Sequence, residues 1–181
     1  MSPPNAMRSF FGTSGARPQE VYTPQVIKDG LSVLWPEGVA LDPCHGSGSI
    51  LDAERTLCIP PTLRGKRQVF EGPDEQNGLK QPWESRTYVN PPFSHLKEWL
   101  EKAVWEGAME RAEILVLSPV RTSRPWFRAA LADCTDAYWL NYNIRFLGFK
   151  DAFPQALCLL YWGQRDLSPA FDHIGERAER R

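Results

Sequence analysis

The chain has 181 residues, of which 42% are hydrophobic and 24% are charged, and this length and composition suit one compact domain. Its 21 Lys and Arg nearly balance its 22 Asp and Glu, so the net charge of -1 excludes a polycationic nucleic-acid binder and leaves only a local basic face for such a contact. No apolar run approaches the roughly 18 residues that a membrane span needs, and residues 1–19 lack the apolar core of a signal peptide. We therefore expect a cytoplasmic protein with no membrane partner.

The cysteines and histidines are scattered along the chain, and no two cysteines form a C-x-x-C pair. This spacing argues against a disulfide framework and against a structural zinc site. We expect no metal and reduced, mostly buried thiols at four positions: Cys44, Cys58, Cys134 and Cys158.

The first elements in chain order are an arm, a helix and a strand. Residues 1–18 mix Ser, Pro, Gly and Arg without apolar periodicity, which predicts a flexible arm. Thr23 can cap a helix that has Pro24 at its first position, and apolar residues at helical spacing continue this helix to Leu34. A short apolar strand, Val39–Leu41, runs directly into the sequence DPCHGSGS.

The middle of the chain is rich in Pro and Gly between residues 50 and 83, which predicts loops around one or two short strands such as Gln68–Phe70. Arg86–Val89 is then expected to be a strand that ends at the sequence NPPF, because prolines cannot continue a central ladder. An apolar stripe predicts the next helix over 96–108.

The last third of the chain alternates again between strand and helix patterns. The expected elements are a strand at 113–117, a helix at 126–132, a strand at 137–140 and a terminal strand pair made by 144–146 and 156–162. This order predicts an α/β fold with a mostly parallel sheet and a terminal antiparallel strand pair. We assign one domain to residues 19–165 and a polar tail to residues 166–181.

The turn after the first strand has the features of a ligand site. Gly46 and Gly48 have no Cβ, so the backbone there can take positive φ and approach a ligand closely. Asp42, at the carboxyl end of the strand, offers an acceptor to amine or hydroxyl donors, and open α/β sheets bind ligands at this edge. The segment has neither the lysine of a P-loop nor the third glycine of a dinucleotide fingerprint, so phosphate binding is disfavoured. A tight turn without a ligand is the alternative.

The sequence NPPF at residues 90–93 suits chemistry on an amino group. Two prolines stiffen the backbone, so the Asn90 side-chain oxygen and the Pro91 carbonyl can both point into one cleft. Two acceptors around a ring-bound amine favour its pyramidal, nucleophilic form. Phe93 offers a surface on which a base can stack, an interaction worth about 1–3 kcal/mol. The alternative is that the prolines end an edge strand and Phe93 belongs to the core.

The two motifs together resemble the arrangement of amino-methyltransferases, and further segments resemble the phage-encoded DNA N6-adenine methyltransferases. The resemblance covers residues 22–162 and includes Thr23-Pro24, 77–83, 88–93, 145–148 and 153–156. It implies a Rossmann-like class I methyltransferase core, S-adenosylmethionine as the methyl donor, and an adenine of DNA, extruded from the duplex, as the acceptor.

The resemblance also implies roles for individual residues. Asn90, Pro91, Pro92 and Phe93 would form the catalytic motif, and the cofactor would be bound by Thr23, Pro24, Asp42, Pro43, Cys44, Gly46 and Gly48. Two positions depart from the family pattern. Asn77 stands where an acidic residue is common, which leaves Glu71 and Asp74 as candidates for the cofactor ribose, and Phe93 replaces a commoner tyrosine.

DNA would be held by a local basic cluster. Arg121, Arg124 and Arg128 follow a predicted strand end on the edge of the expected site, and Arg64, Lys66 and Arg67 form a second candidate cluster. A solvated surface patch is the alternative for either cluster. Because no recognition module follows the catalytic strand, sequence reading would depend on short loops, the arm, or a second copy of the chain in a homodimer.

Other functions use related residues. RNA bases and protein glutamine side chains are acceptors for the same NPPF-type motif, and a non-catalytic module that binds the cofactor or nucleic acid is a further alternative. A dinucleotide oxidoreductase is disfavoured, because the glycine fingerprint is incomplete.

Overall fold

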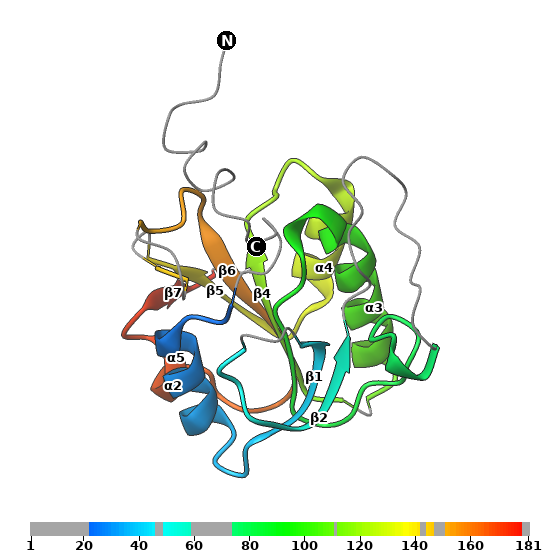
Figure 1. Ribbon diagram of the computed structural model, residues 1–181. Helices are drawn as coiled ribbons and strands as arrows, with labels where there is room; N and C mark the ends of the chain where they lie inside the picture. The colour runs from blue at the N-terminus through cyan, green and yellow to red at the C-terminus, as the bar shows by residue number, and fades with distance from the viewer. Residues whose placement is uncertain are drawn as a thin grey trace.

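The computed structural model describes residues 22–45, 49–58, 74–110, 112–141, 144–146 and 151–178. They form a seven-stranded sheet in the order β2-β1-β3-β4-β6-β5-β7 (Figure 1). The strands are β1 (Val39–His45), β2 (Ala53–Cys58), β3 (Thr87–Val89), β4 (Ile114–Pro119), β5 (Asp136–Leu140), β6 (Leu157–Trp162) and β7 (Gly175–Arg177).

The sheet is parallel in its first half and antiparallel in its second. Strands β2, β1, β3 and β4 pair in parallel, whereas β6 is antiparallel to both β4 and β5, and β7 is antiparallel to β5. The predicted α/β class is confirmed. The sheet was predicted to be mostly parallel, whereas three of its strand pairings are parallel and three are antiparallel.

The predicted pairing of 144–146 with 156–162 is wrong. Residues 144–146 are not in a strand, and β6 inserts between β4 and β5 instead. All six residues of β6 are buried, so this strand is stable only where the sheet is covered on both faces. The Ile144 carbonyl accepts a hydrogen bond from the Phe153 N–H, and this contact ties 144–146 to the chain entering β6.

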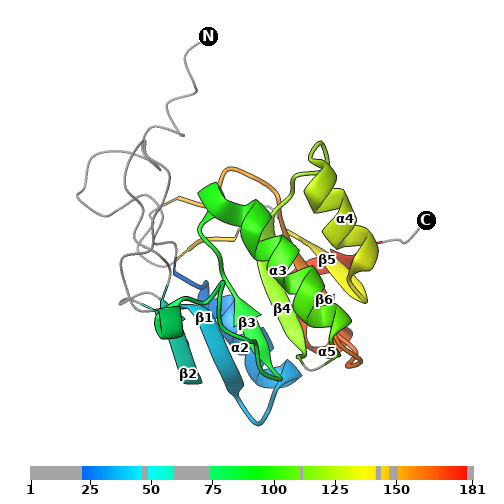
Figure 2. The ribbon, with the colours of Figure 1, turned by 90° about the vertical axis from the view of Figure 1, so that its right-hand side faces the viewer.

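Helices cover both faces of the sheet (Figure 2). They are α2 (Gln25–Leu34), α3 (Leu96–Ala108), α4 (Pro125–Asp133) and the single turn α5 (Ser168–Phe171). Helices α3 and α4 pack on one face and contribute Leu100 and Phe127 to its core, whereas α2 and α5 pack on the other face with Leu31 and Phe171. The predicted helices over 24–34, 96–108 and 126–132 are therefore confirmed within a residue or two.

The carboxyl ends of the parallel strands lie at one edge of the sheet. Leu41 of β1 is in register with Thr87 of β3, and Thr87 is in register with Ile114 of β4. The chain leaves β1, β3 and β4 at this edge, so His45, Asn90 and Val120 begin neighbouring segments there. Antiparallel β6 starts at the same edge, because Leu157 is paired with Pro119.

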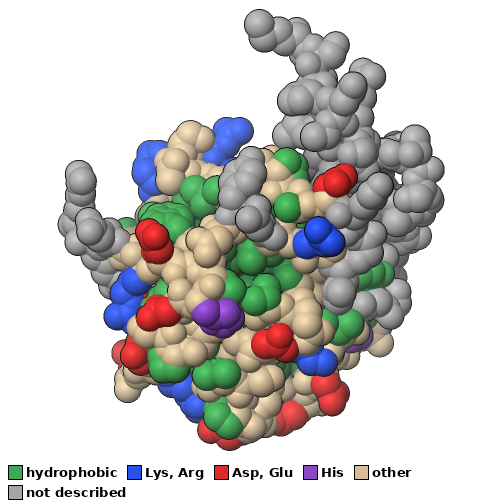
Figure 3. Space-filling model, turned by 90° about the vertical axis from the view of Figure 1, so that its left-hand side faces the viewer, with side chains coloured by type: hydrophobic (Ala, Val, Ile, Leu, Met, Phe, Trp, Pro, Cys, Tyr) green, Lys and Arg blue, Asp and Glu red, His purple; other side chains and the backbone are tan. Residues whose placement is uncertain are grey.

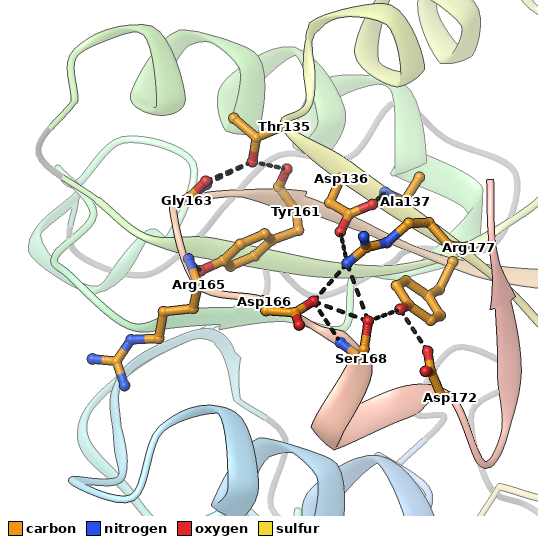
Figure 4. A network of polar contacts seen from close by, with 11 residues as sticks. Thr135, Asp136, Ala137, Tyr161, Gly163, Arg165, Asp166, Ser168, Asp172 and Arg177 are labelled. Carbon is orange, nitrogen blue, oxygen red and sulfur yellow. Dashed lines mark hydrogen bonds and ion pairs between the residues drawn. The ribbon is translucent and has the colours of Figure 1, made fainter. Parts of the chain in front are cut away.

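Residues 166–178 belong to the fold, which differs from the predicted polar tail. Phe171 is fully buried against Gly30 of α2, where an added Cβ would lie 2.2 Å from the Phe171 ring. A polar network anchors the same segment to β5 (Figure 4). In this network Arg177 Nη2 lies 3.0 Å from Asp136 Oδ2 and 2.6 Å from Asp166 Oδ1. Residues 166–178 therefore add β7 beside β5 and cover the edge that β5 would otherwise expose.

Strand β2 lies in the segment 50–83, which was predicted to contain one or two short strands, but its position was not predicted. Leu57 is its one buried side chain and the others are partly buried or exposed, as expected for an edge strand that carries charged residues such as Glu54 and Arg55. The predicted arm at 1–18 and the predicted strand at 68–70 lie outside the described residues.

Among the described residues, no helix is both long enough and apolar enough to cross a membrane. The cysteines are free; three of them are buried, and Cys58 is exposed at the end of β2. The expectation of reduced, mostly buried thiols is confirmed. Within the same part of the chain, no group of three or more His, Cys, Asp or Glu side chains is arranged to hold a metal ion.

Candidate active site

Asp42 is a buried carboxylate near the carboxyl end of β1. It is 4% exposed, its Oδ1 accepts the Cys44 N–H at 3.0 Å, and its Oδ2 lies 3.3 Å from His45 Nδ1. Burial raises the pKa of Asp42 to about 6, although the Cys44 N–H and His45 act in the opposite direction. These polar contacts therefore compensate the burial of the carboxylate only in part, and its pKa lies closer to neutral pH than that of an ordinary aspartate.

The local sequence explains this geometry. Pro43 has no N–H to donate, and the pairing of β1 with β2 shifts register between Asp42 and His45. The freed Cys44 N–H then turns to the Asp42 side chain. Burial raises the pKa of the Cys44 thiol well above its ordinary value, so this cysteine is a packing residue and no nucleophile.

Thr23 and Pro24 lie at the start of α2, where the structure corrects the predicted cap. Pro24 is itself the N-cap, and its carbonyl accepts the N–H groups of Ile27 and Lys28. Thr23 makes no capping hydrogen bond; its side chain is 3% exposed and lies beside the Tyr88 hydroxyl. Thr23 thus turns toward the sheet and away from the helix end.

Tyr88 of β3 lies where the start of α2 and strand β1, which are far apart in the sequence, come together. Its side chain is fully buried, and its pKa is raised by burial and by the charges of Asp42 and Cys44, while Thr23 lowers it. The start of α2, strand β1 and strand β3 therefore meet around the Tyr88 hydroxyl. Tyr88 was not among the predicted site residues. Its position, a hydroxyl-bearing side chain two residues before Asn90, was the one feature of the sequence that could have indicated a role.

Asn90 follows β3 directly, next to the end of β1 that carries Asp42. The residue is partly exposed, whereas its side-chain oxygen is buried. Pro91 and Pro92 are buried, and the Pro92 carbonyl accepts the His95 N–H in the short helix η2 (Phe93–His95) that leads into α3. The alternative of an edge strand is wrong, because β3 lies between β1 and β4.

Phe93 belongs to a cluster of three aromatic rings. Its ring centre lies 6.1 Å from that of Phe146 and 5.3 Å from that of Phe153, both in edge-to-face geometry. Phe146 and Phe153 are buried, whereas Phe93 stays partly exposed. The two buried rings fix the orientation of Phe93 and leave part of its ring available. The resemblance picked out segments 145–148 and 153–156, and their residues Phe146 and Phe153 support the NPPF motif physically.

The turn at Asn77 and Gly78 packs onto Pro43 of β1. Asn77 is buried, and its side-chain oxygen accepts the Leu79 N–H at 3.0 Å, so it organises a turn and offers no carboxylate. A Cβ added to Gly78 would lie 2.1 Å from the Pro43 carbonyl oxygen, so only glycine fits there without a backbone shift.

A buried glutamate secures this turn from α3. Glu106 is fully buried, and its Oε1 accepts the Trp83 N–H at 3.2 Å. The Trp83 indole in turn donates to the Gly78 carbonyl at 2.8 Å. The position of Pro43 is thus linked to α3 through the Gly78 and Trp83 contacts. The contact between Glu106 and Trp83 could not be predicted, because the sequence around Glu106 has the pattern of an ordinary helix surface.

The arginine cluster lies just after β4, on the same edge as Asn90. Arg121 is half-buried, and its Nη2 donates to Gln155 Oε1 at 2.8 Å; burial and the neighbouring charge of Arg124 lower its pKa. Arg124 is the exposed N-cap of α4, and exposed Arg128 donates to the Thr122 carbonyl at 2.9 Å. On the face shown in Figure 3, acidic and basic side chains are interspersed, in keeping with the near-neutral net charge.

Several predicted site residues cannot be placed. Gly46 and Gly48 of the cofactor turn, the cluster Arg64, Lys66 and Arg67, Glu71 and the side chain of Asp74 lie outside the described residues. Of the other predicted positions, Thr23, Asp42 and Cys44 lie around Tyr88, and Pro24 and Pro43 are next to them in the chain. Asn90, Pro91, Pro92 and Phe93 follow β3, the strand beside β1.

Comparison with known proteins bears on the second half of this site. Residues 70–153 match the model of the DNA N-6-adenine-methyltransferase (Dam) family. The matched segment contains β3, the NPPF motif, the arginine cluster and Phe146 and Phe153, and it ends before β6; β1 and the start of α2 lie outside it. No curated protein and no solved structure matches the chain. The resemblance to DNA N6-adenine methyltransferases is confirmed over this segment.

Proposed function

We propose that the protein transfers a methyl group from S-adenosylmethionine to the N6 amino group of adenine in DNA. The observation that carries the proposal is the meeting of two motifs around Tyr88: the buried Asp42 carboxylate lies in β1, three residues before its end at His45, and Asn90 follows the neighbouring strand β3. The match over residues 70–153 supports DNA adenine methylation in particular. Four parallel strands with helices on both faces suit a Rossmann-like methyltransferase core.

The residues around Asp42 fit the proposed cofactor. S-adenosylmethionine carries an ammonium group and a sulfonium, and a buried carboxylate that burial penalises gains most from a cationic partner. Asp42, Pro43 and Cys44 would bind it with Thr23 and Pro24 from α2, and Gly46 and Gly48 would complete the turn. When bound, the cofactor supplies an electrophilic methyl group on a positively charged sulfur.

Asn90 would hold the attacking nitrogen. In the proposed mechanism its side-chain oxygen and the Pro91 carbonyl accept hydrogen bonds from the two N–H groups of the adenine amine. Both acceptors favour the pyramidal amine and stabilise the positive charge that develops on nitrogen. The two prolines keep this backbone stiff, because φ is fixed at both positions. Catalysis would then depend on orientation and electrostatics from the protein.

Phe93 would stack on the extruded adenine. Extrusion of a base costs a few kcal/mol, and stacking on an aromatic ring returns about 1–3 kcal/mol of that cost. Phe146 and Phe153 hold the Phe93 ring by edge contacts, so the stacking surface is already oriented before DNA binds. The missing tyrosine hydroxyl would leave this role intact.

A methylation assay with labelled S-adenosylmethionine tests the proposal. Duplex DNA, structured RNA and a protein mixture are supplied in parallel, and the labelled product is digested and identified. We expect label in N6-methyladenine from DNA. Label confined to RNA or to glutamine side chains would contradict the proposed substrate. Calorimetric titration that shows cofactor binding without any transfer would favour a non-catalytic module.

A further inference from the structure

Two chain segments are joined at the edge of the sheet that carries the proposed site. The segment after β4 begins at Val120, whose N–H donates to the Ala156 carbonyl at 2.9 Å, just before β6. One residue farther from the sheet on each segment, Arg121 donates to the Gln155 side chain at 2.8 Å. The antiparallel register of β4 and β6, with Pro119 opposite Leu157, brings these positions together.

This junction is close in the chain to the aromatic cluster. Gln155 is two residues from Phe153, and the Phe153 ring contacts that of Phe93 with their centres 5.3 Å apart. Phe153 is itself fixed by its N–H bond to the Ile144 carbonyl. The orientation of Arg121 is therefore set by the same short segment that orients the proposed base-stacking ring.

The side-chain partner of Arg121 is neutral, as is the Thr122 carbonyl that Arg128 contacts, whereas other arginines of the described chain pair with carboxylates. Four arginines pair with carboxylates: Arg55 with Glu84, Arg86 with Glu54, Arg165 with Glu37 and Arg177 with Asp166. A carboxylate partner cancels the charge of the guanidinium, whereas an amide oxygen orients it and leaves its charge intact. A half-buried, oriented guanidinium with its full charge is suited to an anion such as a DNA phosphate.

We propose that Gln155 is a positioning residue that directs Arg121 onto the DNA phosphate next to the extruded adenine. The inference rests on the proposed function and adds to it a phosphate site and the residue that builds the site. In this arrangement Phe93 contacts the base, Arg121 contacts its backbone, and the segment 153–156 fixes both. Arg124 and Arg128, which are exposed, would add further positive charge.

Salt dependence of DNA binding tests the charge of Arg121. Binding of a fluorescein-labelled duplex of mixed sequence is followed by anisotropy at several salt concentrations. Gln155→Glu keeps the shape of the side chain but supplies a carboxylate that pairs with Arg121. We expect Gln155→Glu and Arg121→Ala each to reduce the slope of log affinity against log salt by about 0.9.

The control for lost charge is Arg55→Gln on β2, whose arginine is already paired with Glu84. This variant should keep the parental slope. A parental slope for Gln155→Glu or for Arg121→Ala would overturn the proposal.

A neutral substitution tests positioning separately. Gln155→Met has similar length but no acceptor, so it releases Arg121 without cancelling its charge. We expect the parental salt slope, an unchanged affinity for S-adenosylmethionine and a kcat for methylation reduced about tenfold by lost orientation. A parental kcat would overturn the positioning role. Anisotropy needs no turnover, so a parent protein that methylates no DNA would refute the proposed function while the salt slopes still test the inference.

Discussion

Asp42 combines burial with a raised pKa, and this combination predicts opposite pH dependences for stability and for cofactor binding. The pKa is raised from 3.8 to about 6, so the folded protein binds the proton more tightly than the unfolded chain. The contribution of Asp42 to stability therefore rises as the pH falls from 7 to 5, because protonation relieves the buried charge. The affinity for cationic S-adenosylmethionine should fall over the same range, by up to about tenfold per pH unit.

Asp42→Asn isolates this effect, because the asparagine oxygen can still accept the Cys44 N–H. We expect the variant to be more stable than the parent at pH 7 by about 1–3 kcal/mol and to bind the cofactor weakly at every pH. Thermal unfolding and calorimetric titration at matched pH values measure both quantities. A parent protein whose cofactor affinity is constant between pH 5 and 7 would contradict the role of Asp42.

Phe93 carries the second prediction at the scale of single residues. Phe93→Tyr should keep activity, since the ring remains, whereas Phe93→Leu should lower kcat/KM for DNA by roughly tenfold to a hundredfold through lost stacking. Cofactor affinity should be unchanged in both variants, because Phe93 is not among the residues around Asp42. Equal kcat/KM for the leucine variant and the parent would place Phe93 in the core alone.

At this scale the sequence was informative where chemistry is local. Asn90 stands before two prolines, so its position at the end of β3 could be predicted. The predicted turn at Asp42 is wrong, because β1 continues through Pro43 to His45 and Asp42 lies inside the strand. Tyr88 and the inward turn of Thr23 could not, because both depend on contacts between segments more than sixty residues apart in the chain. Phe146 and Phe153 were identified only through the family resemblance.

The close packing of Gly78 onto Pro43 of β1 predicts the effect of a substitution at Gly78. Gly78→Ala would push a methyl group into the Pro43 carbonyl, so we expect a loss of about 1–3 kcal/mol of stability together with weaker cofactor binding. Denaturant unfolding and calorimetric titration measure the two effects.

Gly38→Ala serves as the matched control at the other end of β1. Gly38 has φ of 89° and open space around it, so alanine there costs about 1–2 kcal/mol of backbone strain without touching the Pro43 turn. This variant should lose stability but keep parental cofactor affinity. Equal cofactor affinities in the two variants would show that the Gly78 contact does not shape the site.

Elements were predictable where their pattern was strong. Helices α2, α3 and α4 and strands β3, β4 and β5 follow apolar periodicity, and each was predicted nearly to its ends. Strand β2 was missed because an edge strand needs little burial. The pairing of β6 was missed because an apolar run shows that a strand is covered on both faces but not which strands flank it.

The whole molecule depends on its last described segment. Phe171 fills the space against Gly30, so Phe171→Ala should destabilise the protein by about 3–5 kcal/mol through the cavity it leaves. His173→Ala, at an exposed position two residues later, should stay within about 0.5 kcal/mol of the parent. If both variants unfold at the parental denaturant midpoint, the segment is the separate tail that its polar composition predicted.

This segment shows the limit of composition as a guide to the fold. Six of the 13 residues in 166–178 are polar or charged, yet four side chains of this segment are buried in one of the two cores: Leu167, Ala170, Phe171 and Ile174. Arg177 and Asp166 form the anchoring network with Asp136 of β5, so the charge of this segment does not make it a solvated tail. Phage origin, a cytoplasmic location and a homodimer stay predictions from the sequence.

The central claim, methylation of adenine in DNA by the Asn90 site, is tested most directly in cells. The chain and its Asn90→Ala variant are expressed in a host without adenine methylation of its own, and the DNA is sequenced by a method that detects N6-methyladenine. Folding and cofactor binding of the purified variant are checked by unfolding and titration. We predict methylated adenines with the parent chain and none with the variant. Methylation by Asn90→Ala at the parental level would contradict the account.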